Sequence, residues 1–148
     1  MRTRVIAVLV ALLATFALTA PGTAQAAGCG SSFDQWVGTY TGTYFYEPWW
    51  EAPDTYALRV ELTSVASGSL RSVTTVDGQG FPQQEAPKYG TDGIFTWTTA
   101  ATYPQRYFAD EVSCAGGGVS SATGEIWAYD GPPYGWIPIG RYELARGA

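Results

Sequence analysis

The fold of this chain is decided by one stretch, Trp36-Val37-Gly38-Thr39-Tyr40-Thr41-Gly42-Thr43-Tyr44-Phe45-Tyr46. Its even positions carry aromatic rings or glycine, and its odd positions carry threonine, valine or phenylalanine. Successive side chains of a strand point to opposite faces, so this period of two predicts a β-strand, which we place over residues 33–46. Glycine alternating with rings on one face is typical of a strand that bends around a small interior.

The chain after residue 30 continues in the same way, because Thr, Val, Tyr, Trp and Phe dominate and Gly and Pro punctuate them. Six further strands are expected, over residues 55–65, 70–76, 94–103, 106–114, 123–129 and 135–146, and residues 77–92 are expected to be mostly loop. This pattern predicts an all-β fold, a small antiparallel up-and-down β-barrel of about 7–8 strands, with a β-sandwich as the alternative. Pairing of the first and last strands would remove the open edges.

The first 26 residues have the three parts of a secretory signal peptide. Arg2 and Arg4 form a basic region, residues 5–20 are almost wholly apolar, and Ala24-Gln25-Ala26 is a small-x-small cleavage pattern. The alternative, a membrane anchor, would be short for a bilayer. We therefore expect a secreted protein with one domain over residues 27–148, and no membrane contact after cleavage.

Two cysteines remain after cleavage, Cys29 and Cys114. An even number of cysteines behind a signal peptide predicts one disulfide, worth about 4–5 kcal/mol for so long a loop. The alternative is a lipoprotein anchored at Cys29, because Ala26-Ala27-Gly28-Cys29 is similar to the lipobox of bacterial lipoproteins.

Composition excludes several kinds of site. The chain of 148 residues has no histidine, which excludes a Ser-His-Asp triad, a Cys-His dyad and a His-ligated zinc site. Cleavage would leave six basic against thirteen acidic residues, which excludes nucleic acid as a partner. The spacing of a calcium-binding loop is missing, so we expect no metal and no cofactor.

Aromatic residues make up 15% of the chain. Those expected to face the barrel interior are Trp36, Tyr40, Tyr44, Trp97, Trp136 and Tyr142. They either line a pocket for a small ligand or fill the interior of a small barrel, and the sequence leaves both interpretations open.

Two loops are also rich in rings. Residues 47–54 contain Trp49 and Trp50, which cannot both face a core from an extended chain, so at least one should be exposed. Exposed Trp beside carboxylates is typical of glycan or protein recognition, and the alternative is a loop that covers one barrel end. Residues 129–136 contain Tyr134 and Trp136, and the two loops would frame a barrel mouth if they were adjacent.

Asp110 and Glu111 are the candidates for catalysis. They are neighbours in an expected strand, so one should face inward with a raised pKa, and paired carboxylates can hydrolyse glycosides without histidine. The alternative is that Glu111 lies on the outer face and Asp110 pairs with Arg106 or Arg141.

The two ends of the chain resemble the calycin group of β-barrels, which includes lipocalins and avidins. The resemblance rests on residues 36–40 and on Gly140-Arg141-Tyr142-Glu143-Leu144, although the family has the order Gly-x-Trp where this chain has Trp-x-Gly. It implies that Arg141 or Arg146 lies over Trp36, and that the barrel holds a cavity for a small, largely apolar ligand.

These features predict a secreted binding protein that recognises a small apolar or aromatic ligand, or a glycan, through aromatic side chains of a barrel. One alternative is an enzyme inhibitor or protein-interaction module that docks on a secreted protein through the Trp49-Trp50 loop. The other is a histidine-free carboxylate enzyme, and we expect binding rather than catalysis.

Overall fold

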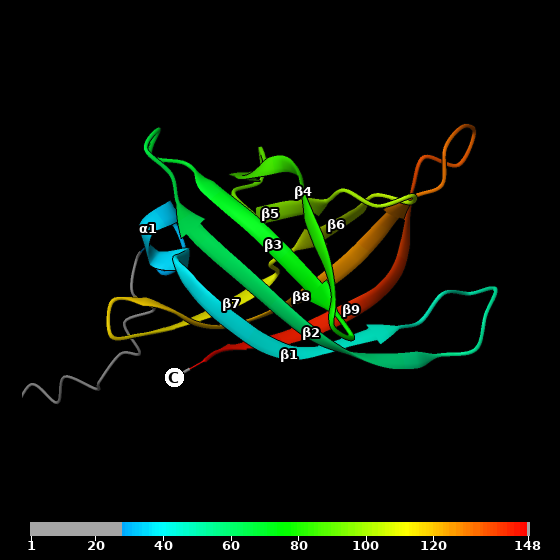
Figure 1. The fold of residues 1–148 in the computed structure, drawn as a ribbon, viewed down its shortest axis with the longest axis horizontal. Helices are drawn as coiled ribbons and strands as arrows, with labels where there is room; N and C mark the ends of the chain where they lie inside the picture. Colours follow the sequence, from blue (N-terminus) through cyan, green and yellow to red (C-terminus); the bar gives the residue numbers. More distant parts are fainter. Residues whose placement is uncertain (1–27, 148) are drawn as a thin grey trace, which may run out of the picture.

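The structure, a computed structural model, describes residues 28–147 (Figure 1). One helical turn precedes nine strands: α1 (Phe33–Trp36), β1 (Gly38–Tyr46), β2 (Asp54–Ser64), β3 (Leu70–Val76), β4 (Gln79–Tyr89), β5 (Phe95–Thr99), β6 (Gln105–Phe108), β7 (Glu111–Ala115), β8 (Gly118–Tyr129) and β9 (Trp136–Arg146). The expected signal peptide lies outside the described residues.

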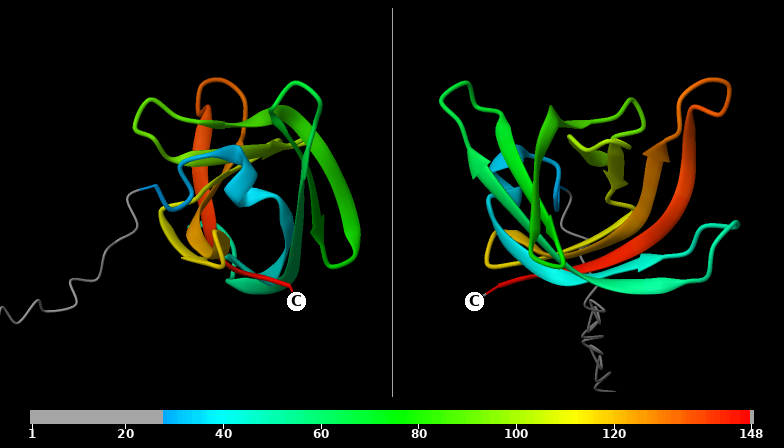
Figure 2. Two further views of the ribbon diagram at one scale, coloured as in Figure 1. Left: turned by 90° about the vertical axis from the view of Figure 1, so that its left-hand side faces the viewer. Right: turned by 45° about the vertical axis from the view of Figure 1, so that its right-hand side comes forward.

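Eight of the strands form a closed antiparallel barrel (Figures 1 and 2). Pairing runs in the order β6-β5-β4-β3-β2-β1-β9-β8, and pairing of β6 with β8 closes the ring. The first and last strands, β1 and β9, meet with Tyr44 opposite Tyr142. β7 extends the sheet beyond β8 and lies outside the ring. The predicted up-and-down β-barrel is therefore confirmed.

The predicted alternation holds in the first two strands. Tyr40 and Tyr44 of β1 are buried, as are three residues of β2: Leu58, Val60 and Leu62. Gly42 pairs with Leu144 of β9, and a Cβ atom at Gly42 would overlap the carbonyl oxygen of Glu143. Glycine is thus required at this position so that the two paired backbones can approach closely.

Two predictions about the elements were wrong. Residues 33–36 form a helical turn instead of the start of a strand, because Ser32 and Gln35 complete a capping box. Residues 77–92 are not mostly loop, since β4 pairs with both β3 and β5. Pro87 falls in a register shift of the pairing with β5, where a proline is tolerated. Next to Pro82, the Gln83 side chain accepts the Ser72 backbone N–H at 2.8 Å.

The predicted strand over residues 106–114 is divided between β6 and β7. At the division the Ala109 N–H donates to the Phe95 carbonyl, and the Asp110 N–H donates to the Thr123 carbonyl. β6 pairs with both β5 and β8, whereas β7 pairs with β8 alone, so the chain loses its contact with β5 at this point and β7 lies outside the ring.

One end of the barrel is closed by α1 and the segment before it (Figure 2, left). The Trp36 ring stacks on Phe95 with 4.1 Å between ring centroids, and its indole N–H donates to the Gly30 carbonyl at 2.9 Å. The Tyr89 hydroxyl donates to the same carbonyl at 2.8 Å. These contacts tie the covering segment to the barrel interior.

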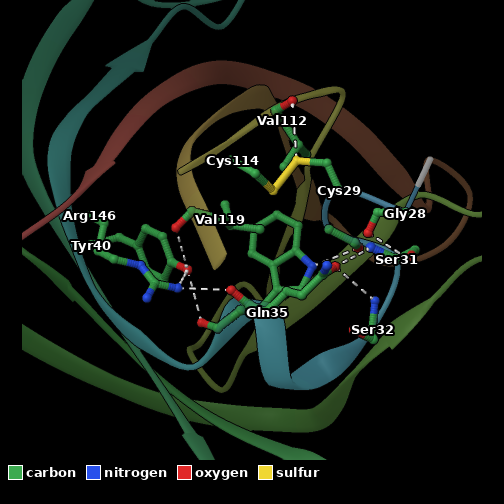
Figure 3. Close-up of a disulfide and its surroundings, with 12 residues drawn as sticks. Gly28, Cys29, Ser31, Ser32, Gln35, Tyr40, Val112, Cys114, Val119 and Arg146 are labelled. Atoms are coloured by element: carbon green, nitrogen blue, oxygen red, sulfur yellow. Dashed lines mark hydrogen bonds between the residues drawn. A yellow bond between two sulfur atoms is a disulfide. The ribbon is translucent and has the colours of Figure 1, made fainter. Parts of the chain in front are cut away.

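The predicted disulfide between Cys29 and Cys114 is present and fixes this segment to β7 (Figure 3). Arg146, at the end of β9, donates to the Gln35 carbonyl at 2.8 Å and to the Tyr40 hydroxyl at 2.9 Å. Its guanidinium carbon lies 5.4 Å from the centre of the Tyr40 ring, so Tyr40 takes the cation–π position expected for Trp36. Arg141 instead lies over Phe45.

Candidate functional site

The two aromatic loops both lie at the end of the barrel opposite α1 (Figure 1). The β1–β2 connection carries Trp49 and Trp50, and the β8–β9 connection carries Tyr134. All three line one cavity, as expected if the loops frame a barrel mouth. The short connection between β5 and β6 adds Tyr103 to the same wall.

This outer cavity has a volume of about 680 Å³. It is lined by Tyr46, Trp49, Trp50, Tyr103, Gln105, Ala128, Tyr129, Asp130, Tyr134, Ile137 and Ile139. Six large hydrophobic side chains are exposed among the described residues, and five of them belong to this lining. Exposed rings are therefore concentrated at one place on the molecule instead of being scattered over it.

A second cavity of about 460 Å³, which we call the inner cavity because it reaches the buried Tyr44, lies at the same end of the barrel. It shares Tyr46, Tyr103 and Gln105 with the outer cavity, and its remaining lining is Tyr44, Tyr56, Val76, Asp77, Gln79, Phe81, Thr99, Ala101 and Thr102. The shared residues make the two cavities neighbours. This second lining is richer in hydroxyl and amide groups than the first, so the two can hold chemically different parts of one ligand.

Tyr44 forms the buried part of the inner cavity. Its ring meets Tyr56 edge to face at 5.8 Å between centroids and lies 6.2 Å from Tyr46. Burial is the main cause that raises the pKa of the Tyr44 hydroxyl well above its ordinary value, and the neighbouring Tyr46 and Tyr56 raise it further. The hydroxyl therefore stays protonated at neutral pH and can donate a hydrogen bond to a ligand.

A packed layer of rings separates the cavities from the closed end. Trp97 stacks on Tyr107 with centroids 5.0 Å apart and meets Tyr142 edge to face at 5.4 Å. The Tyr107 hydroxyl donates to Gln105 Oε1 at 2.8 Å, and the Tyr142 hydroxyl donates to the Phe108 carbonyl at 2.9 Å. Of the rings expected to face inward, Trp36, Tyr40, Trp97 and Tyr142 fill the barrel, and Tyr44 reaches a cavity.

The prediction that Trp136 faces the interior was wrong. The pairing of β8 with β9 shifts between Ile126 and Trp127, so the alternation along β9 changes phase. Ile137 and Ile139 point into the barrel mouth, and Trp136 lies on the outer wall beneath the Arg106 guanidinium, 4.2 Å from its ring centre. A β-bulge of this kind has no clear mark in a single sequence.

The mouth is acidic. Asp130 lines the outer cavity, Asp77 lines the inner one, and Glu51 accepts the Tyr46 hydroxyl at 3.1 Å. Burial, and then this Glu51 carboxylate, raise the pKa of Tyr46. Of the described residues that line the two cavities, none is Lys or Arg. Arg141 lies close by on the outer wall, where it pairs with Glu47 at 3.5 Å.

The two candidate catalytic carboxylates lie elsewhere. Asp110 and Glu111 are both exposed, so the expectation that one of them faces inward was wrong. Asp110 precedes β7, and its Oδ2 accepts the Glu125 backbone N–H at 3.1 Å. Burial is the main cause that raises the pKa of Asp110, and the nearby Glu125 carboxylate raises it further. Neither carboxylate lines the inner or the outer cavity.

Several lining residues were not singled out from the sequence, among them Tyr103, Tyr129 and the two isoleucines of β9. Tyr103 did carry a signal, because it precedes Pro104 in a loop, as Pro48 precedes Trp49 and Pro133 precedes Tyr134. A ring beside a loop proline is thus a shared feature of the mouth.

No model of a known protein family matches the chain, and no curated protein matches it. Among solved structures, the chain is similar to a protein of unknown function of the DUF3598 family from Nostoc punctiforme, with a TM-score of 0.50 and 9% sequence identity. The match covers 78% of this chain and 49% of that protein, so the chain spans about half of its length. At this identity the similarity shows the fold alone.

In the part of the chain that the structure describes, no helix has the length and apolar character needed to cross a membrane.

Proposed function

We propose that this protein is a secreted binding protein that takes a small, largely apolar ligand at the open end of its barrel. The observation that carries the proposal is the convergence of five exposed rings on one cavity of about 680 Å³. Ligand sites of small molecules usually measure about 300–1,000 Å³ and are lined by rings with a few polar groups. Exposed apolar side chains that gather in one place are typical of a binding site.

A relationship to the calycin barrels is part of this proposal. Two features support it: the ring of eight antiparallel strands, and the contact between the last strand and the turn that holds Trp36. Such barrels take ligands at their mouths, which agrees with the position of the two cavities.

Secretion is proposed on two grounds. The signal-peptide pattern of residues 1–26 directs a chain to export, and the Cys29–Cys114 disulfide is typical of an oxidising compartment. Lipidation of Cys29 would need the same sulfur atom that bonds to Cys114. Non-reducing mass spectrometry of protein from the culture medium would distinguish a disulfide from a lipid adduct.

A fluorescent probe tests the binding proposal. N-Phenyl-1-naphthylamine is neutral and aromatic, and its emission rises in apolar surroundings, so we expect a saturable increase with one site per chain. Replacing Trp49 and Trp50 together by Ala should weaken the affinity for the probe about tenfold or more, because both rings line the outer cavity.

The matched control is Trp127→Phe, since Trp127 lies on the outer wall with its indole N–H bonded to Glu125 at 2.8 Å. This variant should bind the probe as the unaltered protein does. No saturable increase with the unaltered protein would contradict the proposal.

A second candidate function is docking on another secreted protein, and the 87% exposure of Trp49 favours it. A single exposed Trp at the tip of a loop is a frequent anchor of protein interfaces. Affinity capture from the culture medium, compared between the unaltered chain and Trp49→Ala, tests it. A captured protein that is retained by Trp49→Ala would exclude this loop as the docking surface.

A further inference from the structure

We infer that the ligand of the outer cavity is an organic cation, such as a quaternary ammonium compound, held among the aromatic rings of the mouth. This inference rests on the proposed binding function and names the chemical class of the ligand. It follows from two properties of the cavity: the aromatic rings of its lining and the sign of its charges.

Aromatic rings make up much of the lining of the outer cavity. Trp49 and Trp50 meet at 85° with centroids 5.5 Å apart, so the two indoles present faces in different directions. Tyr46, Tyr103 and Tyr134 add further rings to the same cavity. The face of an aromatic ring is negative and attracts a cation by about 0.5–2 kcal/mol, and cages of several rings are a known way to hold quaternary ammonium groups.

The charges favour the same ligand. Asp130 is part of the lining, and Glu51 is held at the rim by the Tyr46 hydroxyl. A positively charged ligand would find two carboxylates and several ring faces there. A fatty acid or a phosphate ester would meet the same carboxylates without any lining Lys or Arg to balance its charge.

The nearest described cations are engaged on the outer wall. Arg141 pairs with Glu47 at 3.5 Å and with Glu143 at 3.3 Å, and Arg106 lies over the outward Trp136 ring. Both guanidinium groups are therefore held away from the cavity by contacts of their own. The negative potential of the mouth remains available to a ligand.

The hydrogen-bonding groups of the outer cavity are the tyrosine hydroxyls, the indole N–H groups of Trp49 and Trp50, and the side chains of Gln105 and Asp130. An ammonium group substituted with methyl groups needs no hydrogen bond, so its attraction to the site depends on the ring faces and the carboxylates.

A pair of ligands that share a shape and differ in charge tests this inference. Choline and 3,3-dimethylbutan-1-ol are such a pair, because a carbon atom of the alcohol replaces the ammonium nitrogen. Their affinities can be measured by NMR from the indole N–H signals of the six tryptophans. We expect choline to bind about tenfold more tightly and to shift the Trp49 and Trp50 signals, while the Trp36 and Trp97 signals stay in place.

Variants that remove single carboxylates test whether the charges of the mouth cause the preference for choline. Glu51→Gln and Asp130→Asn should each reduce the affinity for choline several-fold and leave that for the neutral alcohol unchanged. Glu61→Gln is the control, since it removes a half-buried carboxylate that pairs with Arg59 near the other end of β2 and lines neither cavity. It should change neither affinity.

Equal affinities for the two ligands, or tighter binding of the alcohol, would overturn the inference. The same holds if neither compound moves the Trp49 and Trp50 signals at concentrations that saturate a millimolar site. In all these cases the binding function itself is judged separately by the neutral naphthylamine probe. The ligand pair therefore tests whether the ligand is a cation, and the naphthylamine probe tests separately whether the cavity binds a ligand.

Discussion

Both ends of the barrel are built from aromatic rings, but the chain covers those rings only at one end. At the closed end Trp36 is 2% exposed, stacks on Phe95 and donates its indole N–H to Gly30. At the open end Trp49 is 87% exposed and packs edge to face with its neighbour Trp50. The same residue type thus stabilises the fold at one end and is free to meet a ligand at the other.

The difference lies in what covers each end. A short helical turn and a disulfide hold a segment of chain across the closed end. The loops at the open end carry prolines beside their rings, which restrict the backbone, and no helix covers this end among the described residues. Stability is therefore expected to depend on the closed end and the packed centre, and ligand binding on the open end.

The largest effect is expected from alkaline pH, which acts on the enclosed rings. Burial raises the pKa of Tyr107 and of Tyr142 above the ordinary value near 10. The folded protein therefore holds these protons more strongly than the unfolded chain. Their contribution to stability is fully present below pH 10 and is lost as the pH rises above it.

We expect cooperative unfolding in this alkaline range, with tyrosinate absorbance and loss of near-ultraviolet circular dichroism changing together. If the absorbance of all the tyrosines rose while the dichroism stayed native, Tyr107 and Tyr142 would not be enclosed as described.

The next effect concerns the disulfide. Replacing Cys29 and Cys114 together by Ser should lower the free energy of unfolding by about 4–5 kcal/mol, because the bond joins residues 85 positions apart and restricts the unfolded chain. Urea denaturation measures the loss. The naphthylamine probe should still bind the folded variant, since the bond is at the opposite end from the mouth. A loss below about 1 kcal/mol would show that ring packing alone closes this end.

The last comparison separates the two ends directly, and its second variant has the smallest expected effect. Trp36→Ala should cost about 3–5 kcal/mol, because it removes a buried ring and its hydrogen bond. Trp49→Ala should change the free energy of unfolding by less than about 0.5 kcal/mol, because the ring is exposed. Thermal denaturation of both variants gives the comparison. Similar losses in the two variants would mean that the mouth loops also stabilise the fold.

Much of the fold could be predicted from local patterns. The alternation in residues 38–46 and 54–64 predicted which faces are buried, and the two cysteines predicted the disulfide. Predictions failed where a contact with a distant strand overrode the local pattern. β4 forms despite Pro82 and Pro87 because strands on both sides pair with it. Trp136 turns outward because the pairing with β8 shifts by a residue.

The candidate site shows the same division. The sequence placed Trp49, Trp50 and Tyr134 in two ring-rich loops and predicted that at least one of the two tryptophans is exposed, and in the structure all three line one cavity. The sequence did not indicate which inward-facing rings reach the open end of the barrel. Alternation along a strand predicts which face a residue is on, but not how deep in the barrel the residue lies. Tyr44 and Tyr142 pair across adjacent strands, yet Tyr44 meets the inner cavity and Tyr142 belongs to the packed layer.

By itself the sequence determined that this chain forms strands around an aromatic interior and carries one disulfide, since these depend on local alternation and on the number of cysteines. Only the tertiary structure decided which barrel end is covered and which is open. It also brought together three loops, carrying Trp49, Tyr103 and Tyr134, that lie far apart along the chain. Closure of the barrel by pairing of β6 with β8 and of β1 with β9 is the physical reason, because it places the ends of all these strands at one rim.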